Sequence, residues 1–211
     1  MRRKRDPVKS FEHTLRHALM FFLLLSLFFP TRPLAESKAR QFHQTSQIYL
    51  TLQSSNMDLC RSSARALAEA IWHESKKHAL DPLVILAVIK IESEFRPAAV
   101  SPYGARGLMQ LLPAVAHSLA EDADLDAWEG ETSLHDPVTN IKLGAFYLAR
   151  LKEKFGDLTV ALTAYNRGPT WVQKQIENRI ALPEEYARKV LSASRIYREH
   201  GRDRRSGNIN A

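Results

Sequence analysis

The sequence predicts an all-α protein, and three observations support this. Apolar residues recur at helical spacing from about residue 62 to residue 200. The pairs Asp81-Pro82 and Asp136-Pro137 are typical helix starts, because aspartate accepts a backbone hydrogen bond there and proline needs none at the first helical position. Runs with the alternation of β-strands are nearly absent, apart from a short hairpin expected within residues 97–112.

Each predicted helix has an apolar stripe and a recognisable start or stop. In chain order the predicted helices cover residues 64–78, 83–93, 138–155, 158–166, 170–179 and 184–200. The second is apolar on nearly all sides, which is typical of a helix in the centre of a domain. Asp157 precedes the fourth as a cap, Gly168-Pro169 separates the fourth from the fifth, and Gly201 is expected to end the last.

The N-terminus has the composition of a secretory signal. Residues 1–16 are basic, residues 18–29 form an almost unbroken apolar run, and Ala35 offers a small residue for cleavage. The run is shorter than the ~20 residues of a comfortable membrane span. We therefore interpret residues 1–35 as a signal peptide, with a retained signal anchor in the inner membrane as the alternative. Either form places the remainder of the chain in the periplasm.

The charge distribution says little about the partners of the working domain, and no nucleic-acid partner is expected. The formal net charge is +7, but residues 1–35 hold seven of the basic residues and two of the acidic ones, which leaves +2 for the rest. The single cysteine, Cys60, cannot close an internal disulfide. We expect a polar stalk or extension over residues 36–61, one catalytic domain over residues 62–201, and a basic tail over residues 202–211.

Glu92 is the first candidate for chemistry. It lies near the end of the most apolar predicted helix, beside Val88 and Ile89. Apolar surroundings disfavour the charged form of a carboxyl group and raise its pKa, as a general acid near neutral pH requires. On this ground alone, a solvated glutamate at a helix end remains the alternative.

The segment after Glu92 favours a ligand site. Gly104 and Gly107 permit a tight loop in which the backbone can approach a ligand closely, and two prolines add to its irregularity. Ser101 and Gln110 place neutral hydrogen-bonding groups in the same loop. A carboxyl group in an apolar setting beside neutral polar groups suits an uncharged polar ligand such as a sugar.

Three motifs in order then resemble a known family. They are ES-x-F followed by S-P-x-G-A-x-G-L-M-Q-L-x-P, then DPVTNIKLGAFYLARL, then ALTAYNRGPTWV. Together they resemble the soluble-type lytic transglycosylase domain, which is related to goose-type lysozyme. The resemblance covers residues from about Leu67 to Tyr197 and implies a lysozyme-like helical fold.

The resemblance also implies roles for individual residues. Glu92 matches the catalytic glutamate, and the substrate-binding positions correspond to Ser101, Met109, Gln110, Tyr165, Asn166 and Tyr186. One departure concerns the last motif, E-T-x-x-Y. Its tyrosine aligns with Tyr186, but Leu182 stands in place of the glutamate, unless Glu184 or Glu185 replaces it through a local shift.

The activity implied by the resemblance is cleavage of peptidoglycan glycan strands without water. One glutamate would protonate the bond between N-acetylmuramic acid and N-acetylglucosamine, then accept a proton as a 1,6-anhydro end forms. The alternatives are a lysozyme-like hydrolase and an inactive glycan-binding scaffold. The biological role is left open between general wall turnover and opening the wall for a secretion or conjugation machine, which would then be a partner.

No metal or other cofactor is expected. The segment HESKKH at residues 73–78 resembles the zinc motif H-E-x-x-H, but Lys77 occupies the second histidine position. His78 lies about 140° around the helix from His73, so the two rings cannot share one ion.

Overall fold

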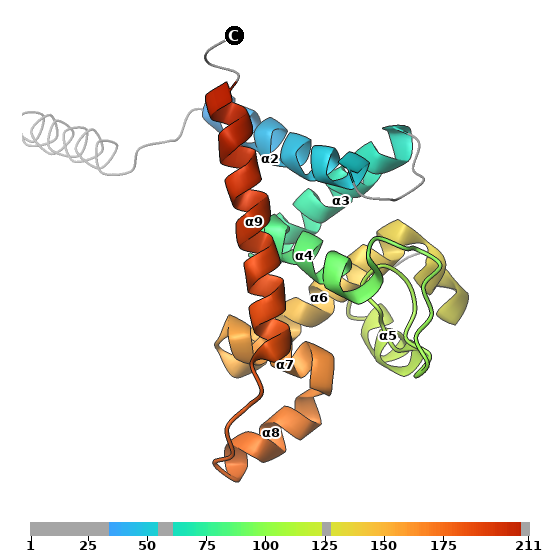
Figure 1. Cartoon of the computed structure of the whole chain (residues 1–211). Helices are drawn as coiled ribbons and strands as arrows, with labels where there is room; N and C mark the ends of the chain where they lie inside the picture. The colour runs from blue at the N-terminus through green and yellow to red at the C-terminus, as the bar shows by residue number, and fades with distance from the viewer. Residues whose placement is uncertain (1–33, 55–60, 124–127, 208–211) are drawn as a thin grey trace, which may run out of the picture. The chain divides into compact units, whose positions relative to one another are not determined.

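The structure, a computed structural model of the 211-residue chain, describes residues 34–54, 61–123 and 128–207. The chain divides into two units, residues 1–40 and 41–211, and the second contains α2 from residue 41 on together with all the later helices. Figure 1 shows the helices. They are α2 (Leu34–Ser54), α3 (Arg61–Lys77), α4 (Pro82–Ser93), α5 (Pro113–Ala120), the 3₁₀-helix η1 (Glu131–His135), α6 (Pro137–Phe155), α7 (Leu158–Arg167), α8 (Pro169–Glu177) and α9 (Glu185–Gly207).

The all-α prediction is confirmed. Within the described ranges the structure contains helices and no β-strand, and the expected hairpin in residues 97–112 is reduced to two isolated β-bridges. These bridges pair Arg106 with Val100 on one side and with Leu111 on the other. They close a compact loop rather than extend a sheet.

Three aspartates begin helices as predicted. Asp81 accepts a hydrogen bond from the Leu83 backbone N–H at 2.9 Å, and its helix begins with Pro82. Asp136 and Asp157 cap α6 and α7 in the same way, through bonds of 2.7 and 2.9 Å. Each such cap contributes about 1 kcal/mol to stability.

Helix α4 occupies the centre of the core, as its all-round apolar sequence predicts. Its residues from Pro82 to Ile89 are buried, and those from Ile85 to Ile89 have no exposed surface. It packs against α3 and along α9, while α6 packs against α3 and α7. Glu92 is thereby held in the last turn of the most buried helix of the described structure.

The prediction of a polar stalk over residues 36–61 is wrong for the part that forms α2. Ile48 and Leu52 are fully buried and belong to the main hydrophobic cluster. They stand four residues apart and so share one face of the helix. Because the other residues of this segment are mostly polar, the apolar stripe is too narrow to predict a helix from periodicity.

The expected stop at Gly201 is also wrong. Helix α9 continues through Gly201 to Gly207, so the predicted basic tail begins as helix, and residues 208–211 lie outside the described part. Gly201 is buried, and a Cβ atom on it would lie 2.2 Å from the amide nitrogen of Gln47 in α2. The glycine permits a close approach of two helices instead of ending one.

No helix among the described residues has the length and hydropathy of a membrane span. The apolar run at residues 18–29, on which the signal prediction depends, lies outside the described ranges.

The loop between α4 and α5 is fixed from inside by Asn140 of α6. The Asn140 amide nitrogen donates to the carbonyls of Arg106 and Leu134 at 3.0 and 2.9 Å, and its oxygen accepts the Met109 N–H at 2.7 Å. Gly107 lies directly against this amide: a Cβ atom there would lie 2.2 Å from both the Asn140 nitrogen and the Leu134 oxygen. The loop therefore has one defined seat on α6.

Two glycines of this loop provide a matched test of that seat. Gly104 and Gly107 have φ values of 81° and 79°, but only Gly107 has neighbours that a Cβ atom would meet. We expect Gly104→Ala to destabilise by about 1–2 kcal/mol, the cost of the left-handed backbone, and Gly107→Ala by about 3 kcal/mol or more. Urea unfolding measures both values. Equal losses would show that Gly107 is not pressed against Asn140 in solution.

Candidate active site

The Glu92 carboxyl group is half-buried and receives a hydrogen bond from a tyrosine. The Tyr186 hydroxyl, in the first turn of α9, donates to Glu92 Oε1 at 2.5 Å. Burial raises the pKa of Glu92 from its ordinary value of 4.5, and the Tyr186 bond, a smaller effect, lowers it. The result is a carboxyl group that stays protonated to higher pH than an exposed glutamate and still has a partner for its charged form.

Two tyrosines surround Glu92. Burial raises the pKa of Tyr165 and of Tyr186 well above the ordinary value, and the negative charge of Glu92 raises both further. Both therefore remain neutral hydrogen-bonding groups wherever Glu92 titrates. The Tyr165 ring packs on Tyr147, with ring centroids 5.3 Å apart, and its hydroxyl donates to the Met109 carbonyl at 2.8 Å.

The site thus joins three helices and a loop. Glu92 comes from α4, Tyr165 from α7 and Tyr186 from α9, and Tyr165 connects them to the loop through Met109. Among the described residues, the influences on the Glu92 pKa are burial and the Tyr186 bond, and no second carboxylate is one of them. The arrangement can deliver and take back one proton in a setting of neutral polar groups.

The Met109 side chain lies in the core. It has no exposed surface and packs against Gly144 of α6, where a Cβ atom would lie 2.4 Å from its sulfur. Its backbone N–H and carbonyl are both used, by Asn140 and Tyr165. In this conformation Met109 fastens the loop to α6 and α7.

The remaining predicted positions are partly or fully exposed. The Ser101 hydroxyl accepts the Ala105 N–H at 3.1 Å, which leaves its proton able to donate to a ligand. The Gln110 amide nitrogen donates to two loop carbonyls at 2.9 and 3.1 Å. Asn166 is exposed near the end of α7.

Comparison with known proteins identifies the domain. The model of the family described as "Transglycosylase SLT domain" matches residues 69–187, more than half of the chain. The chain belongs to this transglycosylase family. At the level of the family, its enzymatic domain is a lytic transglycosylase domain.

Relatives from a phage and from bacteria support the same conclusion. A transglycosylase of Enterobacteria phage PRD1 is 39% identical over 100 residues, which cover 47% of this chain and 34% of the phage protein. The soluble lytic murein transglycosylase of Salmonella typhimurium is 35% identical over 94 residues, which cover 44% of this chain and 15% of that protein. The chain thus matches between 15% and 34% of the length of these two curated relatives.

Solved structures share the fold. An inactive mutant of the lytic transglycosylase Slt from Pseudomonas aeruginosa superposes with a TM-score of 0.57 and 29% identity, covering 63% of this chain and 24% of that one. The 70 kDa soluble lytic transglycosylase of Escherichia coli gives a TM-score of 0.59 at 24% identity, covering 76% of this chain and 29% of the other, and this shows the fold alone. The prediction of a lysozyme-like lytic transglycosylase fold is confirmed.

Leu182, where the sequence departs from the motif of this transglycosylase family, packs against the hydrophobic core and is half-buried. The two nearby acids that a local shift could supply are both exposed. Glu185 forms an ion pair with Lys189 at 2.8 Å, and this hydrogen bond lowers its pKa. Leu182 therefore contributes to the core and supplies no second carboxylate at this motif position.

Two residues of the site were not predicted as functional from the sequence. The buried Ser93 hydroxyl lies 3.0 Å from the Ile89 carbonyl and 2.8 Å from the Leu108 carbonyl, so it joins the end of α4 to the loop. Asn140 holds the same loop from α6. Asn140 falls within a quoted motif, but the motif gives no sign of which backbone groups it binds.

The part of the chain that the structure describes contains no cluster of three or more His, Cys, Asp or Glu side chains suited to a metal. The histidines of HESKKH both lie 3.3 Å from the buried Glu74 carboxylate, each on a different oxygen.

The raised pKa of Glu92 predicts a pH-dependent gain in stability for Glu92→Gln. Between 4.5 and the raised value, native Glu92 holds a proton that the unfolded chain has lost, so the stability of the unmodified protein falls as pH rises through this window. Glutamine does not titrate. The melting temperature of Glu92→Gln should therefore match wild type near pH 4 and exceed it at neutral pH, by about 2–4 °C for each kcal/mol.

Differential scanning calorimetry from pH 4 to pH 8 measures this difference. Glu184→Gln, which removes an exposed carboxylate, is the control and should not reproduce the curve. A Glu92→Gln variant that is equally or less stable at neutral pH would contradict the buried, destabilised carboxylate.

Proposed function

We propose that the chain cleaves the β-1,4 bond between N-acetylmuramic acid and N-acetylglucosamine in peptidoglycan, with formation of a 1,6-anhydro end. The observation that carries this proposal is the half-buried Glu92, whose pKa is raised and which is paired with the neutral Tyr186 hydroxyl. The family assignment supports the substrate, as does the Salmonella typhimurium relative, which is a soluble lytic murein transglycosylase.

The first step is protonation of the leaving oxygen. Glu92 in its neutral form donates its proton to the glycosidic oxygen as the bond to the anomeric carbon of N-acetylmuramic acid breaks. Burial keeps this form populated to higher pH than in an exposed glutamate. The N-acetylglucosamine side leaves as an alcohol, and Glu92 becomes a carboxylate.

The second step returns the proton. The 6-hydroxyl of the muramic acid attacks its own anomeric carbon, and the Glu92 carboxylate accepts the hydroxyl proton. Because nucleophile and electrophile belong to one sugar, the reaction gains from proximity and needs no activated water. The Tyr186 hydrogen bond stabilises the carboxylate during the interval between the two transfers.

One carboxyl group suffices for this sequence. Most glycosidases place two carboxyl groups about 5–10 Å apart, one of which activates water or attacks the sugar. The influences on the Glu92 pKa within the described residues do not include a second carboxylate, and Leu182, where the motif has a glutamate, packs against the hydrophobic core. This favours the intramolecular route over a lysozyme-like hydrolysis.

We also propose that the domain acts in the periplasm. The basic and apolar composition of residues 1–35 supports export, and a relative from Actinobacillus pleuropneumoniae, 30% identical over 120 residues, is named a membrane-bound lytic murein transglycosylase.

Replacing Glu92 with glutamine tests the mechanism. Glu92→Gln keeps an acceptor for Tyr186 but cannot donate a proton to the leaving oxygen, so the cleavage rate should fall by about 10²–10⁴-fold while binding to glycan strands persists. Mass spectrometry of products from intact sacculi measures the 1,6-anhydro ends, which are one water lighter than reducing ends.

Glu94→Gln is the matched control, because Glu94 is exposed and stands two residues beyond Glu92. It should release anhydro products at close to the wild-type rate. Wild-type activity in Glu92→Gln would overturn the assignment of the acid, and reducing ends from the wild-type protein would identify a hydrolase.

A further inference from the structure

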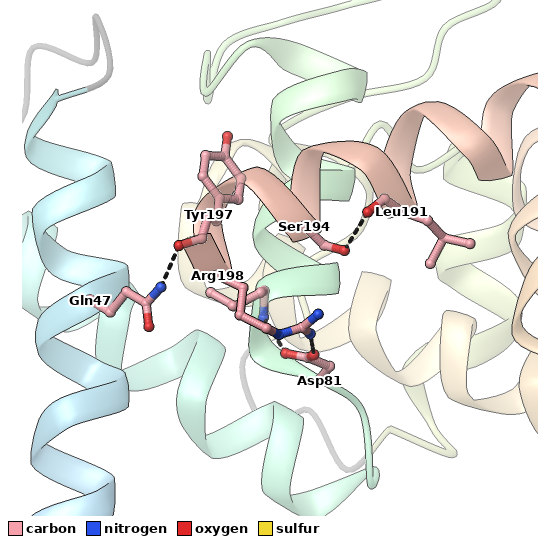
Figure 2. A network of polar contacts seen from close by, with 7 residues as sticks. Gln47, Asp81, Leu191, Ser194, Tyr197 and Arg198 are labelled. Carbon is pink, nitrogen blue, oxygen red and sulfur yellow. Dashed lines mark hydrogen bonds and ion pairs between the residues drawn. The ribbon is translucent and has the colours of Figure 1, made fainter. Parts of the chain in front are cut away.

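The segments outside the family match contact one another. The match ends at residue 187, whereas α9 continues to Gly207, and α2 lies entirely before the match. The Gln47 side chain of α2 donates to the Tyr197 carbonyl of α9 at 2.6 Å (Figure 2). Gly201, one turn further along, allows this close approach.

The C-terminal half of α9 is also tied to the start of α4. Arg198 forms an ion pair with Asp81, the residue that caps α4 (Figure 2). Asp81 uses its other oxygen, Oδ1, for the cap to Leu83. With both oxygens engaged, the carboxylate has a fixed orientation, and it holds Arg198 in a fixed place.

Helices α4 and α9 are thus an antiparallel pair joined at both ends. At one end Tyr186 meets Glu92, and at the other Arg198 meets Asp81. The spans agree: at 1.5 Å per residue, residues 81–92 cover about 17 Å and residues 186–198 about 18 Å. Between the two ends, Ala187, Val190 and Ser194 are buried.

The end of α9 that carries Tyr186 follows an irregular segment, since α8 ends at Glu177 and α9 begins at Glu185. Before Tyr186 the chain is held by Leu182, which packs on the core, and by the Thr163 hydroxyl, which donates to the Pro183 carbonyl at 3.3 Å. The axial position of the helix beyond this point comes from packing along α4 and from contacts further along α9. A small shift of α9 along its axis would lengthen the 2.5 Å bond to Glu92.

We propose that Arg198 is a positioning residue that, by holding α9 on Asp81, keeps the Tyr186 hydroxyl in place against Glu92. Gln47 of α2 supports the same end of α9. This proposal rests on the proposed function of Glu92. Arg198 lies at the opposite end of α4 from Glu92 and acts through Tyr186 alone.

The energy of the ion pair fits this role better than a stabilising one. The Arg198 and Asp81 side chains are 44% and 37% exposed, and exposed pairs of this kind contribute little to the free energy of unfolding. Losing such a pair leaves the fold intact. A change of a few tenths of an ångström at the Tyr186 hydroxyl would still alter a short hydrogen bond to a titrating carboxyl group.

Titratable and charged side chains lie near both the Glu92–Tyr186 contact and the Asp81–Arg198 contact. Tyr186 donates to Glu92, and Tyr165 is near enough for the Glu92 charge to raise its pKa; both tyrosines are neutral, so the titration of Glu92 reports the Tyr186 bond. The ion pair lies at a pocket of about 370 Å³ between α2, α3, α4 and α9. The other charged or titratable residues of that pocket are His43, Lys76 and Arg202.

The test is the pH dependence of anhydro-product formation by the full chain. Tyr186→Phe removes the donor that stabilises the Glu92 carboxylate, so the limb at which activity falls with rising pH should move to higher pH. Arg198→Gln should move this limb in the same direction by a smaller amount. The double variant should not move it beyond Tyr186→Phe, and Arg198→Lys should restore most of the wild-type profile.

Lys189→Gln is the matched control, because it removes an exposed ion pair with Glu185 on the same helix, one turn from Tyr186. It should leave the limb unchanged. Circular dichroism verifies folding of each variant, and Gln47→Ala is a second route to the same effect should Arg198→Gln unfold.

The outcomes separate the two proposals. If Arg198→Gln or Gln47→Ala lowers activity equally at all pH values, or shifts only the melting temperature, the positioning role is wrong and Glu92 keeps its function. Equal shifts from Lys189→Gln and Arg198→Gln would also overturn it. If Glu92→Gln retains activity, the proposed function itself fails and the limb does not belong to Glu92.

Discussion

The burial of α4 is the constraint on which the rest of the structure depends. A helix that is apolar on all sides must be covered on all sides, and α3 and α9 cover it, with Ile48 and Leu52 of α2 in the same hydrophobic cluster. Its last turn is where the chain must leave the core, and Glu92 stands there. The same packing that stabilises the fold thus places one carboxyl group at the boundary between core and solvent, where its pKa is raised without full burial.

In the loop after Glu92, too, buried residues fix the backbone while other residues remain partly exposed to solvent. Asn140, Gly107 and the Met109 backbone fix the loop through buried contacts with α6 and α7. Buried amide bonds of this kind are costly to leave unmade, so the loop has one stable seat. Ser101 and Gln110 are half-exposed. The buried contacts of the loop backbone hold them in position, so they need no contacts of their own with the core.

Local signals in the sequence predicted much of this arrangement. Helix starts could be predicted at Asp81, Asp136 and Asp157 because a cap acts within three residues. The all-round apolar pattern of α4 predicted its burial. The wrong predictions concern α2, with its narrow apolar stripe, and Gly201, whose neighbour Gln47 is distant in sequence. A glycine that ends a helix and one that admits another helix look alike until the partner is known. The pairing of Arg198 with Asp81, 117 residues apart, leaves no local pattern at all.

In the proposed mechanism one carboxyl group acts first as an acid and then as a base, and the tyrosine beside Glu92 resolves the conflict between these two demands. Burial alone favours the acid and makes the carboxylate costly, whereas a charged partner would favour the carboxylate and weaken the acid. Tyr186 is neutral, and its hydroxyl donates to the carboxylate without adding a charge of its own. The balance depends on the length of a single hydrogen bond, and a side chain on a helix holds such a length only if the helix itself cannot slide. The contacts at the far end of α9 supply that condition, which gives the segments beyond the family domain a part in the chemistry within it.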